Sequence, residues 1–296
     1  MAAQHESQRE LKQILVIGAG TMGHGIAQVA ALAGYEASIF DVAPAAVTKA
    51  LASVKSNLDK GVEKGKVTIE ARDAALARVR AASPTLEEAA QTADLIVEAV
   101  PEKLELKRSI FATLGKHAPA HAILASNTSS LPVTEIAAAS GRPGQVVGMH
   151  FFNPVHIMAL LELVKTAATT PQTLAAARRV GERMGKKVIV VNDAPGFATS
   201  RLGITLGMEA IRMVEEGVAS AEDIDTAMTL GYGHPMGPLK LTDLVGLDVR
   251  LGIAEHLAKT LDERRFAPPA LLKRMVAEGK LGKKSGQGFY DWPAGA

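Results

Sequence analysis

One histidine and one glutamate stand in neighbouring apolar segments of this chain. His150 lies near the end of QVVGMHFF, and Glu162 follows twelve residues later within LLELVKT. Burying either group alone is costly, whereas a hydrogen-bonded pair makes both burials tolerable. We expect the two segments to be adjacent strands, with FFNPV turning between them, so that the two side chains come within hydrogen-bond reach.

A paired imidazole and carboxylate suit acid–base chemistry. An unperturbed histidine has a pKa of about 6.5, which suits proton transfer near neutrality. A carboxylate on the other ring nitrogen fixes the tautomer and stabilises the imidazolium. His150 could therefore take the hydroxyl proton of an alcohol while hydride leaves the adjacent carbon. The alternative is that His150 is a hydrogen-bonded core residue without a chemical role.

A glycine-rich turn offers a place for the hydride acceptor. Gly18, Gly20 and Gly23 form G-x-G-x-x-G directly after the apolar run ILVI and at the start of an alanine-rich segment. In a dinucleotide-binding turn these glycines make the bend, admit the pyrophosphate and let helix and strand pack closely. The helix N-terminus at Thr21 and Met22 would supply amide donors and partial positive charge. The alternative is a tight strand-to-helix turn without a ligand.

Asp41 bears on the choice of cofactor. It ends the second predicted strand, 18 residues beyond Gly23, and no arginine follows in DVAPAAV. A carboxylate there can accept both ribose hydroxyls and would repel a 2′-phosphate. NAD is therefore favoured over NADP, and the alternative is a solvated strand-end residue.

Hydroxyl groups follow another predicted strand, in ASNTSSLPV. Ser129 and its neighbours in residues 126–130 could simply cap the next helix. In an open α/β sheet, however, the carboxyl ends of strands line the ligand crevice. A hydroxyl there can donate a hydrogen bond to a substrate carbonyl or its developing alkoxide.

The secondary-structure elements that must position these groups are predicted to form an α/β domain. The sequence contains short apolar runs, each followed by glycines or polar residues. Such runs predict the strands of a mostly parallel, Rossmann-type sheet. They occur at about 14–17, 37–40, 78–83, 94–100, 122–129, 145–152, 160–166 and 187–191. Between the second and third, residues 44 to about 65 and 68–77 predict two helices, a helical excursion from the sheet.

After NDAPGF, at 192–197, the pattern becomes helical throughout. Helical segments are predicted within 200–217, 220–231, 237–261 and 268–279. We therefore predict two domains, an NAD-binding Rossmann-type domain over 1–192 and an all-helical C-terminal domain over 193–296. SRLGITLGMEAIRMV is apolar on more than one face, which is typical of an interfacial helix or of a core helix.

Composition excludes several classes of protein. The 296 residues include 47% hydrophobic and 22% charged residues, and 33 basic against 31 acidic residues leave a net charge of +2. Basic residues form no block, so neither nucleic acid nor a membrane surface is expected as a partner. Without cysteine there is no disulfide or thiolate metal site, and no metal is expected. The polar start MAAQHESQRELKQ lacks an apolar signal region, and we expect a cytoplasmic protein.

With these residues in view, the chain resembles the 3-hydroxyacyl-CoA dehydrogenase family, which includes bacterial 3-hydroxybutyryl-CoA dehydrogenases. The resemblance covers essentially the whole chain, because the family's motifs occur in order. They are GAGTMGHGIA, VEAVPE, SNTSSL, GMHFFNPV, DAPGF, EDIDTAM, HPMGPL, GLD and LGKKSGQGFYD. The resemblance implies NAD-dependent, reversible oxidation of an (S)-3-hydroxyacyl-CoA to the 3-oxoacyl-CoA, with a short-chain substrate favoured.

The resemblance also implies roles at matching positions. His150 is the implied general base, Glu162 its orienting partner, and Ser129 a hydroxyl that contacts substrate and cofactor. Further implied cofactor contacts are Glu102, Lys107, Asn153 and Lys284. The helical excursion is implied to receive coenzyme A, with Asn57 and Lys64 as contacts, although Lys64 also reads as a solvated helix cation.

Ser200 departs from the family pattern. The family's PGF is followed by two residues and Asn-Arg, whereas this chain reads PGFATSR. Serine offers one donor on a shorter arm than asparagine, which puts direct substrate contact in doubt, although a water could bridge the gap. The family further implies a homodimer formed through the C-terminal helical domain.

Two other functions remain open from the sequence. The fold and the His–Glu pair could serve a dehydrogenase of a small free hydroxy acid or polyol, without coenzyme A. Alternatively, the chain could be a non-catalytic NAD-binding structural protein, against which the intact His150 and Glu162 argue.

Overall fold

The computed structural model of the protein describes residues 10–293. The polar N-terminal segment, on which the expectation of a cytoplasmic protein rests, therefore lies largely outside the described residues. The chain divides into two compact units between Asp193 and Ala194. The boundary predicted at 192/193 falls one residue before this division.

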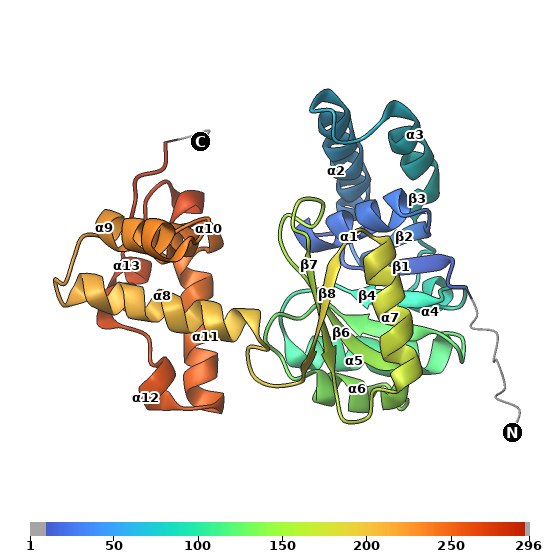
Figure 1. The fold of residues 1–296 in the computed structure, drawn as a ribbon. Helices are drawn as coiled ribbons and strands as arrows, with labels where there is room; N and C mark the ends of the chain where they lie inside the picture. The colour runs from blue at the N-terminus through green and yellow to red at the C-terminus, as the bar shows by residue number, and fades with distance from the viewer. Residues whose placement is uncertain (1–9, 294–296) are drawn as a thin grey trace, which may run out of the picture. The chain divides into compact units, whose positions relative to one another are not determined.

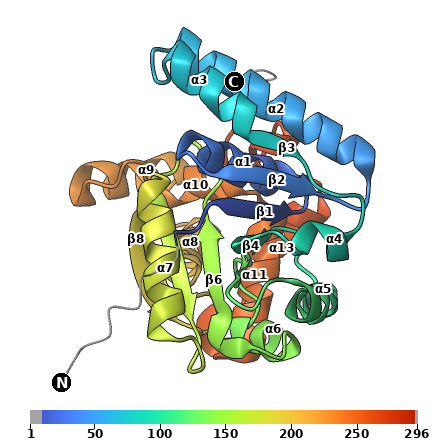
Figure 2. The same ribbon diagram turned by 90° about the vertical axis from the view of Figure 1, so that its right-hand side faces the viewer.

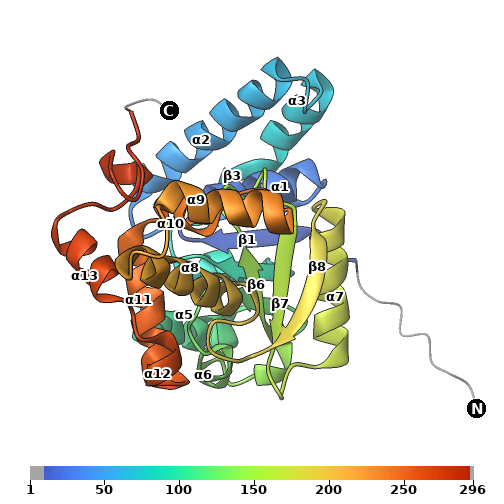
Figure 3. The same ribbon diagram turned by 60° about the vertical axis from the view of Figure 1, so that its left-hand side comes forward.

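The first unit contains an eight-stranded sheet in the order β3-β2-β1-β4-β5-β6-β7-β8. Neighbouring strands are parallel except β6 and β7, which are antiparallel. The strand bounds are β1 (Gln13–Ile17), β2 (Glu36–Phe40), β3 (Val79–Ala81), β4 (Leu95–Glu98), β5 (Ile123–Ser126), β6 (Val146–Phe151), β7 (Leu160–Lys165) and β8 (Lys187–Asn192). Figure 3 shows β6, β7 and β8 side by side at one end of the sheet. Each predicted strand is present, and the mostly parallel sheet is confirmed.

Helices cover both faces of this sheet (Figure 2). Their bounds are α1 (Thr21–Leu32), α2 (Pro44–Glu63), α3 (Ile69–Arg78), α4 (Leu86–Ala90), α5 (Leu104–His117), α6 (Val133–Ala139), the short 3-10 turn η1 (Pro143–Gln145) and α7 (Pro171–Arg183). Ile14 and Val16 of β1 share one apolar cluster with residues of α1 and α7. Leu15 and Ile17 alternate with them and are buried toward the opposite face, where α5 and α6 pack together.

The strand order reverses direction beside β1. The chain runs from β1 to β2 and β3 on one side, and then crosses to β4 on the other side of β1. Ile17 at the end of β1 is in register with Glu98 at the end of β4. In open α/β sheets this switch point, at the carboxyl ends of the strands, is where ligands bind.

The predicted helical excursion is confirmed. Helices α2 and α3 project together from the first unit between β2 and β3 (Figure 1). Val54 and Leu58 anchor α2 with no exposed surface. Gly65, at φ +64°, turns the chain after α2, and the Thr68 hydroxyl caps α3 by accepting from the amide of Ala71.

The second unit is built from helices, and its described residues also contain two isolated β-bridges, between Gly282 and Gln287 and between Gln287 and Asp291. Its elements are α8 (Thr199–Glu215), α9 (Ala221–Thr226), the π-helical turn η2 (Ala227–Gly231), α10 (Pro238–Val245), α11 (Leu247–Thr260), α12 (Glu263–Phe266), α13 (Ala270–Ala277) and the 3-10 turn η3 (Lys283–Ser285). The segment predicted as helical over 237–261 is two helices, because Gly246 at φ +104° breaks it. Asp243 is 1% exposed, and its carboxylate accepts hydrogen bonds from the amides of Phe289 and Tyr290 and from the indole of Trp292. These bonds hold the C-terminal segment against α10.

Candidate active site

The glycine turn between β1 and α1 has the geometry of a dinucleotide-binding turn. Gly18 has φ +101°, and a Cβ there would lie 2.6 Å from the carbonyl oxygen of Ala99. A Cβ on Gly23 would lie 1.7 Å from the carbonyl oxygen of Gly18. Only glycine therefore allows α1 to begin so close to β1.

Gly20 differs from the other two glycines. A Cβ on Gly20 would meet no protein atom within 4 Å, and its φ of −72° suits any residue. Among residues 10–293 no neighbouring atom requires glycine here, so the open space fits a group that approaches from outside, as the pyrophosphate of NAD would. Thr21, exposed, and Met22, half-buried, open α1, whose first turn carries no acidic side chain. The first-turn amides and the helix dipole therefore favour an anion.

Asp41 lies beside this turn. Its Oδ2 accepts from the amide of Ala19 at 2.8 Å, and its Oδ1 accepts from the amide of Ala43 at 3.0 Å. Each oxygen has a second lone pair that a ribose hydroxyl could use. The structure thus brings Asp41 to the glycine turn, as the strand order predicts.

Substituting the glycines separates folding from cofactor binding. We expect Gly23→Ala to lower the free energy of unfolding by about 1–3 kcal/mol or more, because its Cβ overlaps the Gly18 carbonyl oxygen. Gly20→Ala should change that free energy by less than about 1 kcal/mol. It should nevertheless weaken NADH binding at least about tenfold, equivalent to ~1.4 kcal/mol. Urea unfolding and fluorescence titration with NADH measure both; unchanged NADH affinity in Gly20→Ala would contradict the predicted cofactor path.

His150 and Glu162 form the predicted hydrogen-bonded pair. They are directly opposite one another in the antiparallel β6–β7 register, and Nδ1 of His150 lies 2.8 Å from Oε2 of Glu162. His150 is 7% exposed and Glu162 is completely buried. An ionised carboxylate only accepts hydrogen bonds, so opposite an ionised Glu162 the proton sits on Nδ1 and Nε2 is the basic position. The Phe152 ring, 4.4 Å from the imidazole centroid, covers one side of it.

A second imidazole–carboxylate pair lies elsewhere in the sheet. Nε2 of His121 is 2.8 Å from Oδ1 of Asp94. These residues precede β5 and β4, so this pair lies at the amino ends of the parallel strands, whereas ligands of such sheets bind at the carboxyl ends. The sequence reasoning did not single out this pair, and its position separates it from the cofactor turn.

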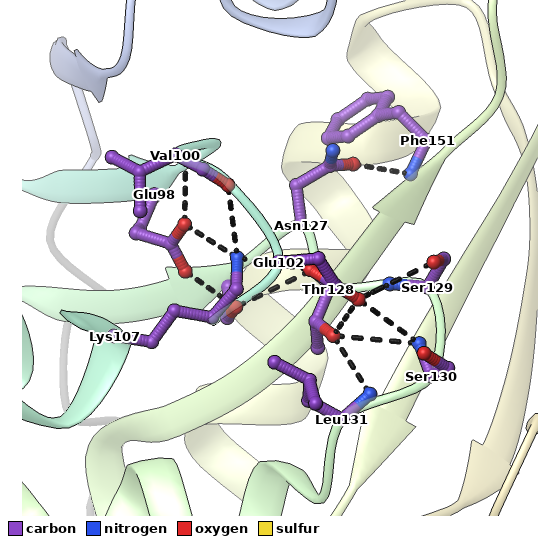
Figure 4. A network of polar contacts seen from close by, with 11 residues as sticks. Glu98, Val100, Glu102, Lys107, Asn127, Thr128, Ser129, Ser130, Leu131 and Phe151 are labelled. Atoms are coloured by element: carbon purple, nitrogen blue, oxygen red, sulfur yellow. Dashed lines mark hydrogen bonds and ion pairs between the residues drawn. The ribbon is translucent and has the colours of Figure 1, made fainter. Parts of the chain in front are cut away.

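Hydrogen bonds join the loop after β4 to the loop after β5 (Figure 4). Glu102 accepts at Oε1 from the hydroxyl of Thr128 at 2.5 Å and from the amide of Ser129 at 2.9 Å. The hydroxyl of Ser129 also lies 3.3 Å from that oxygen. Asn127 reaches β6, where its Oδ1 accepts from the amide of Phe151, the residue after His150. The SNTSSL loop is thus tied on both sides, to Glu102 and to the strand that carries the imidazole.

The residues expected to contact the cofactor lie in different surroundings. Glu102 and Ser129 belong to the fastened loops, and Asn153 is exposed two residues beyond β6. Lys107 is only 1% exposed, and its ammonium contacts protein acceptors. Lys284 belongs to the second unit, where its Nζ lies 2.6 Å from Oδ2 of Asp248.

The residues expected to contact the substrate also divide between the units. Lys64 is exposed at the end of α2. Asn57, on the same helix, donates from Nδ2 to the buried Gln28 of α1 at 3.2 Å and so links the excursion to the cofactor helix. Ser200 is half-buried in the first turn of α8, in the second unit.

Lys186 anchors the loop that follows His150, and no sequence signal pointed to it. Its ammonium donates to the carbonyl oxygens of Val155 and Met158, and the residue is 8% exposed. Burial lowers the pKa of Lys186. Val155 in turn packs against α1, where a Cβ on Gly25 would lie 2.9 Å from it. The loop between β6 and β7 is therefore held against the cofactor helix.

Two family models match the chain almost end to end. The model of the 3-hydroxyacyl-CoA dehydrogenase NAD binding domain matches residues 13–194, and that of the C-terminal domain matches residues 196–292. The chain belongs to the 3-hydroxyacyl-CoA dehydrogenase family. It is accordingly an NAD-dependent dehydrogenase of 3-hydroxyacyl-CoA thioesters.

Individual relatives are similar over nearly their whole length. This dehydrogenase is 48% identical to a probable 3-hydroxybutyryl-CoA dehydrogenase of Bacillus subtilis, over 96% of this chain and 98% of the relative. It is 42% identical to the 3-hydroxybutyryl-CoA dehydrogenase of Mycobacterium tuberculosis, over 95% and 99% of the two chains. The crystal structure of the (S)-3-hydroxybutyryl-CoA dehydrogenase of Ralstonia eutropha superposes with a TM-score of 0.91 at 39% identity, covering 96% and 99%.

Residues 10–293 of the dehydrogenase hold no group of three or more histidine, aspartate or glutamate side chains arranged to bind a metal ion. Within the same residues no helix is long and apolar enough to cross a membrane.

Proposed function

We propose that the protein interconverts short-chain (S)-3-hydroxyacyl-CoA and 3-oxoacyl-CoA, with His150 as the general acid/base and Glu162 as its orienting partner. The observation that carries this proposal is the 2.8 Å contact between Nδ1 of His150 and Oε2 of Glu162, on strands that leave neither group solvated. Bound NAD supplies the hydride acceptor. In the oxidation, Nε2 of His150 takes the hydroxyl proton as the C3–H bond releases hydride to NAD, giving the ketone, NADH and the imidazolium of His150.

Glu162 keeps its contact with Nδ1 of His150 throughout this cycle. With no solvent exposure, its charge is stabilised by the imidazole, and it stabilises the imidazolium in return. In the reverse direction the imidazolium returns the proton to the oxygen. Ser129 is proposed to donate from its hydroxyl to that same oxygen, where negative charge develops.

Cofactor contacts are proposed for the backbone and side chains around the switch point of the sheet and for one residue of the second unit. The supporting observations are the open space at Gly20, the carboxylate of Asp41 beside the turn, and the exposed Asn153 after β6. The proposed set is Gly18, Gly20, Thr21, Met22, Gly23, Asp41, Glu102, Ser129, Asn153 and Lys284.

An assay with acyl-CoA substrates tests the proposed function. The purified protein should oxidise NADH with acetoacetyl-CoA, and NADPH should be at least about tenfold less efficient, because Asp41 would repel a 2′-phosphate. Comparing acetoacetyl-CoA with longer 3-oxoacyl-CoA thioesters tests the short-chain preference. NADH binding without any turnover of these thioesters would contradict the proposal and support a non-catalytic role.

Coenzyme A is proposed to bind at the helical excursion. We expect Lys64→Ala to raise KM for acetoacetyl-CoA about threefold to tenfold, because it removes an exposed contact between a charged side chain and a phosphate. This change corresponds to ~0.7–1.4 kcal/mol of binding free energy. Lys49→Ala is the matched control, since Lys49 is exposed in the first half of the same helix. Acetoacetyl-N-acetylcysteamine lacks the nucleotide, so its KM should not respond to Lys64→Ala. Equal KM values for the Lys64 and Lys49 variants would contradict the proposed contact of Lys64 with coenzyme A.

The second unit is proposed to form a homodimer. Helices α8, α10 and α11 pack on one another, yet each leaves apolar side chains exposed. These side chains are Leu202, Leu206, Leu241, Leu244, Val245 and Val249. A surface of this kind is typical of a protein–protein interface. Light scattering should give twice the chain mass of 31.0 kDa.

A further inference from the structure

A buried carboxylate stands at the end of β4. Glu98 has no exposed surface, and its two oxygens have three donors. Oε1 accepts from the amide of Val100 and from Nζ of Lys107, both at 2.7 Å, and Oε2 accepts from the hydroxyl of Ser126 at 2.6 Å (Figure 4). The carbonyl oxygen of Glu98 also accepts from the amide of Asn127 at 2.7 Å. Glu98 therefore joins the ends of β4 and β5 to the start of α5.

The ammonium of Lys107 has three acceptors around it. They are Oε1 of Glu98 at 2.7 Å, Oε2 of Glu102 at 3.2 Å and the carbonyl oxygen of Val100 at 3.3 Å. An ammonium has three N–H donors, and this one is 1% exposed, so protein atoms account for all of them. Lys107 is thus held by Glu98, by Glu102 and by the backbone at Val100.

Glu102 links Lys107 to the SNTSSL loop. One of its oxygens contacts Lys107, and the other receives the hydroxyl of Thr128 and the amide of Ser129. Removal from water raises the pKa of the Glu102 carboxyl, but the Lys107 charge and the donors from Thr128 and Ser129 outweigh this and hold the pKa below its usual value. Glu102 is therefore ionised near neutrality and accepts at both oxygens.

We propose that Glu98 and Lys107 are positioning residues, whose buried ion pair holds Glu102 and so fixes the place of Ser129 beside the reacting oxygen. The chain of contacts runs from Glu98 to Lys107, then to Glu102 and to the loop that carries Ser129. The inference rests on the proposed role of Ser129 and deepens it. A displacement of about 1 Å in such a group can cost on the order of 10²-fold in rate.

A kinetic cycle with Ser129 tests the proposal. Glu98→Gln keeps the shape of the side chain and removes its charge. We expect it to lower kcat with acetoacetyl-CoA about tenfold, whereas adding Glu98→Gln to Ser129→Ala should change kcat by less than about threefold, because coupled residues are not additive. Equal factors in both backgrounds, or an unchanged kcat in Glu98→Gln, would overturn the proposal. Lys116→Met, exposed in the last turn of α5, is the control for losing a lysine of that helix and should match the wild type.

A second cycle separates positioning from direct contact by Lys107. Lys107→Met leaves the Glu98 carboxylate buried without its cation, so it should be the least stable and least active variant. Adding Glu98→Gln should raise kcat at least about fivefold over Lys107→Met, because the uncompensated charge is gone. If Lys107 contacted the cofactor directly, the double variant would be no more active. If Lys107→Met does not fold, refolding of the double variant supports the pair, and a double variant that also fails to fold overturns it.

Failure of the proposed function is distinguishable from failure of this inference. If the wild type turned over no acyl-CoA, the proposed function would fail. The same single and double variants could then be compared by their NADH dissociation constants and their unfolding midpoints instead of by kcat. Additivity in those two quantities would then overturn the positioning role by itself.

Discussion

His150→Asn is expected to lower kcat with acetoacetyl-CoA and NADH by about 10²- to 10⁴-fold, the usual contribution of a general acid/base. Asparagine has no group that gains or loses a proton near neutral pH, so the reacting oxygen would exchange its proton with solvent alone. NADH affinity should stay within about threefold of the wild type, because the glycine turn is untouched. Stopped-flow absorbance at saturating NADH, with NADH titrated separately by fluorescence, measures the two quantities.

The matched control is His121→Asn. His121 has the same 2.8 Å contact with a carboxylate, on Asp94, but at the amino ends of the strands. Its replacement should lower stability and leave kcat near the wild-type value. Retained turnover in His150→Asn, or an equal loss in both variants, would mean that the imidazole at β6 is not the acid/base.

Glu162→Gln should be the next most damaging change. A loss of about 10²- to 10⁴-fold in kcat is expected, by analogy with the amide substitution of the triad aspartate in serine proteases. The amide keeps the shape of the side chain in this fully buried site, but it cannot stabilise an imidazolium. Its NH₂ group can also donate to Nδ1, which puts the proton on Nε2 and removes the basic position.

The double variant His150→Asn, Glu162→Gln provides the control for a shared function. If the carboxylate acts only through the imidazole, the double variant should be no slower than His150→Asn, since groups that act as a unit are not additive. Steady-state kcat and the midpoint of thermal unfolding should be measured together. Losses that multiply would show that Glu162 contributes independently of His150.

The strands and the glycine turn were predictable because their signals are local. Apolar runs such as that of Ile14 to Ile17 identify buried parallel strands, and the turn glycines follow at fixed spacing. The His150–Glu162 contact was predictable for the same reason. Only eight residues separate β6 from β7, so an antiparallel pairing is short-range and brings the two residues opposite one another. The helical excursion followed from periodicity alone.

The surroundings of Lys107 and Glu98 were not predictable in this way. Of the two carboxylates in VEAVPE, only Glu102 was given a role, whereas the structure shows that Glu98 is buried and accepts from the hydroxyl of Ser126, 28 residues away. Lys107 was expected to contact the cofactor, and its burial among protein acceptors was not part of that prediction. Likewise, one helical segment was expected where Gly246 separates α10 from α11.

The sequence by itself determined the fold class, the cofactor turn and the pairing of an imidazole with a carboxylate, because each depends on residues close together in the chain. The tertiary structure decided which polar side chains became buried anchors and which stayed open to ligands. That outcome depends on which strand ends are adjacent in the sheet, and long-range strand order leaves no periodic signal in the residues that it brings together.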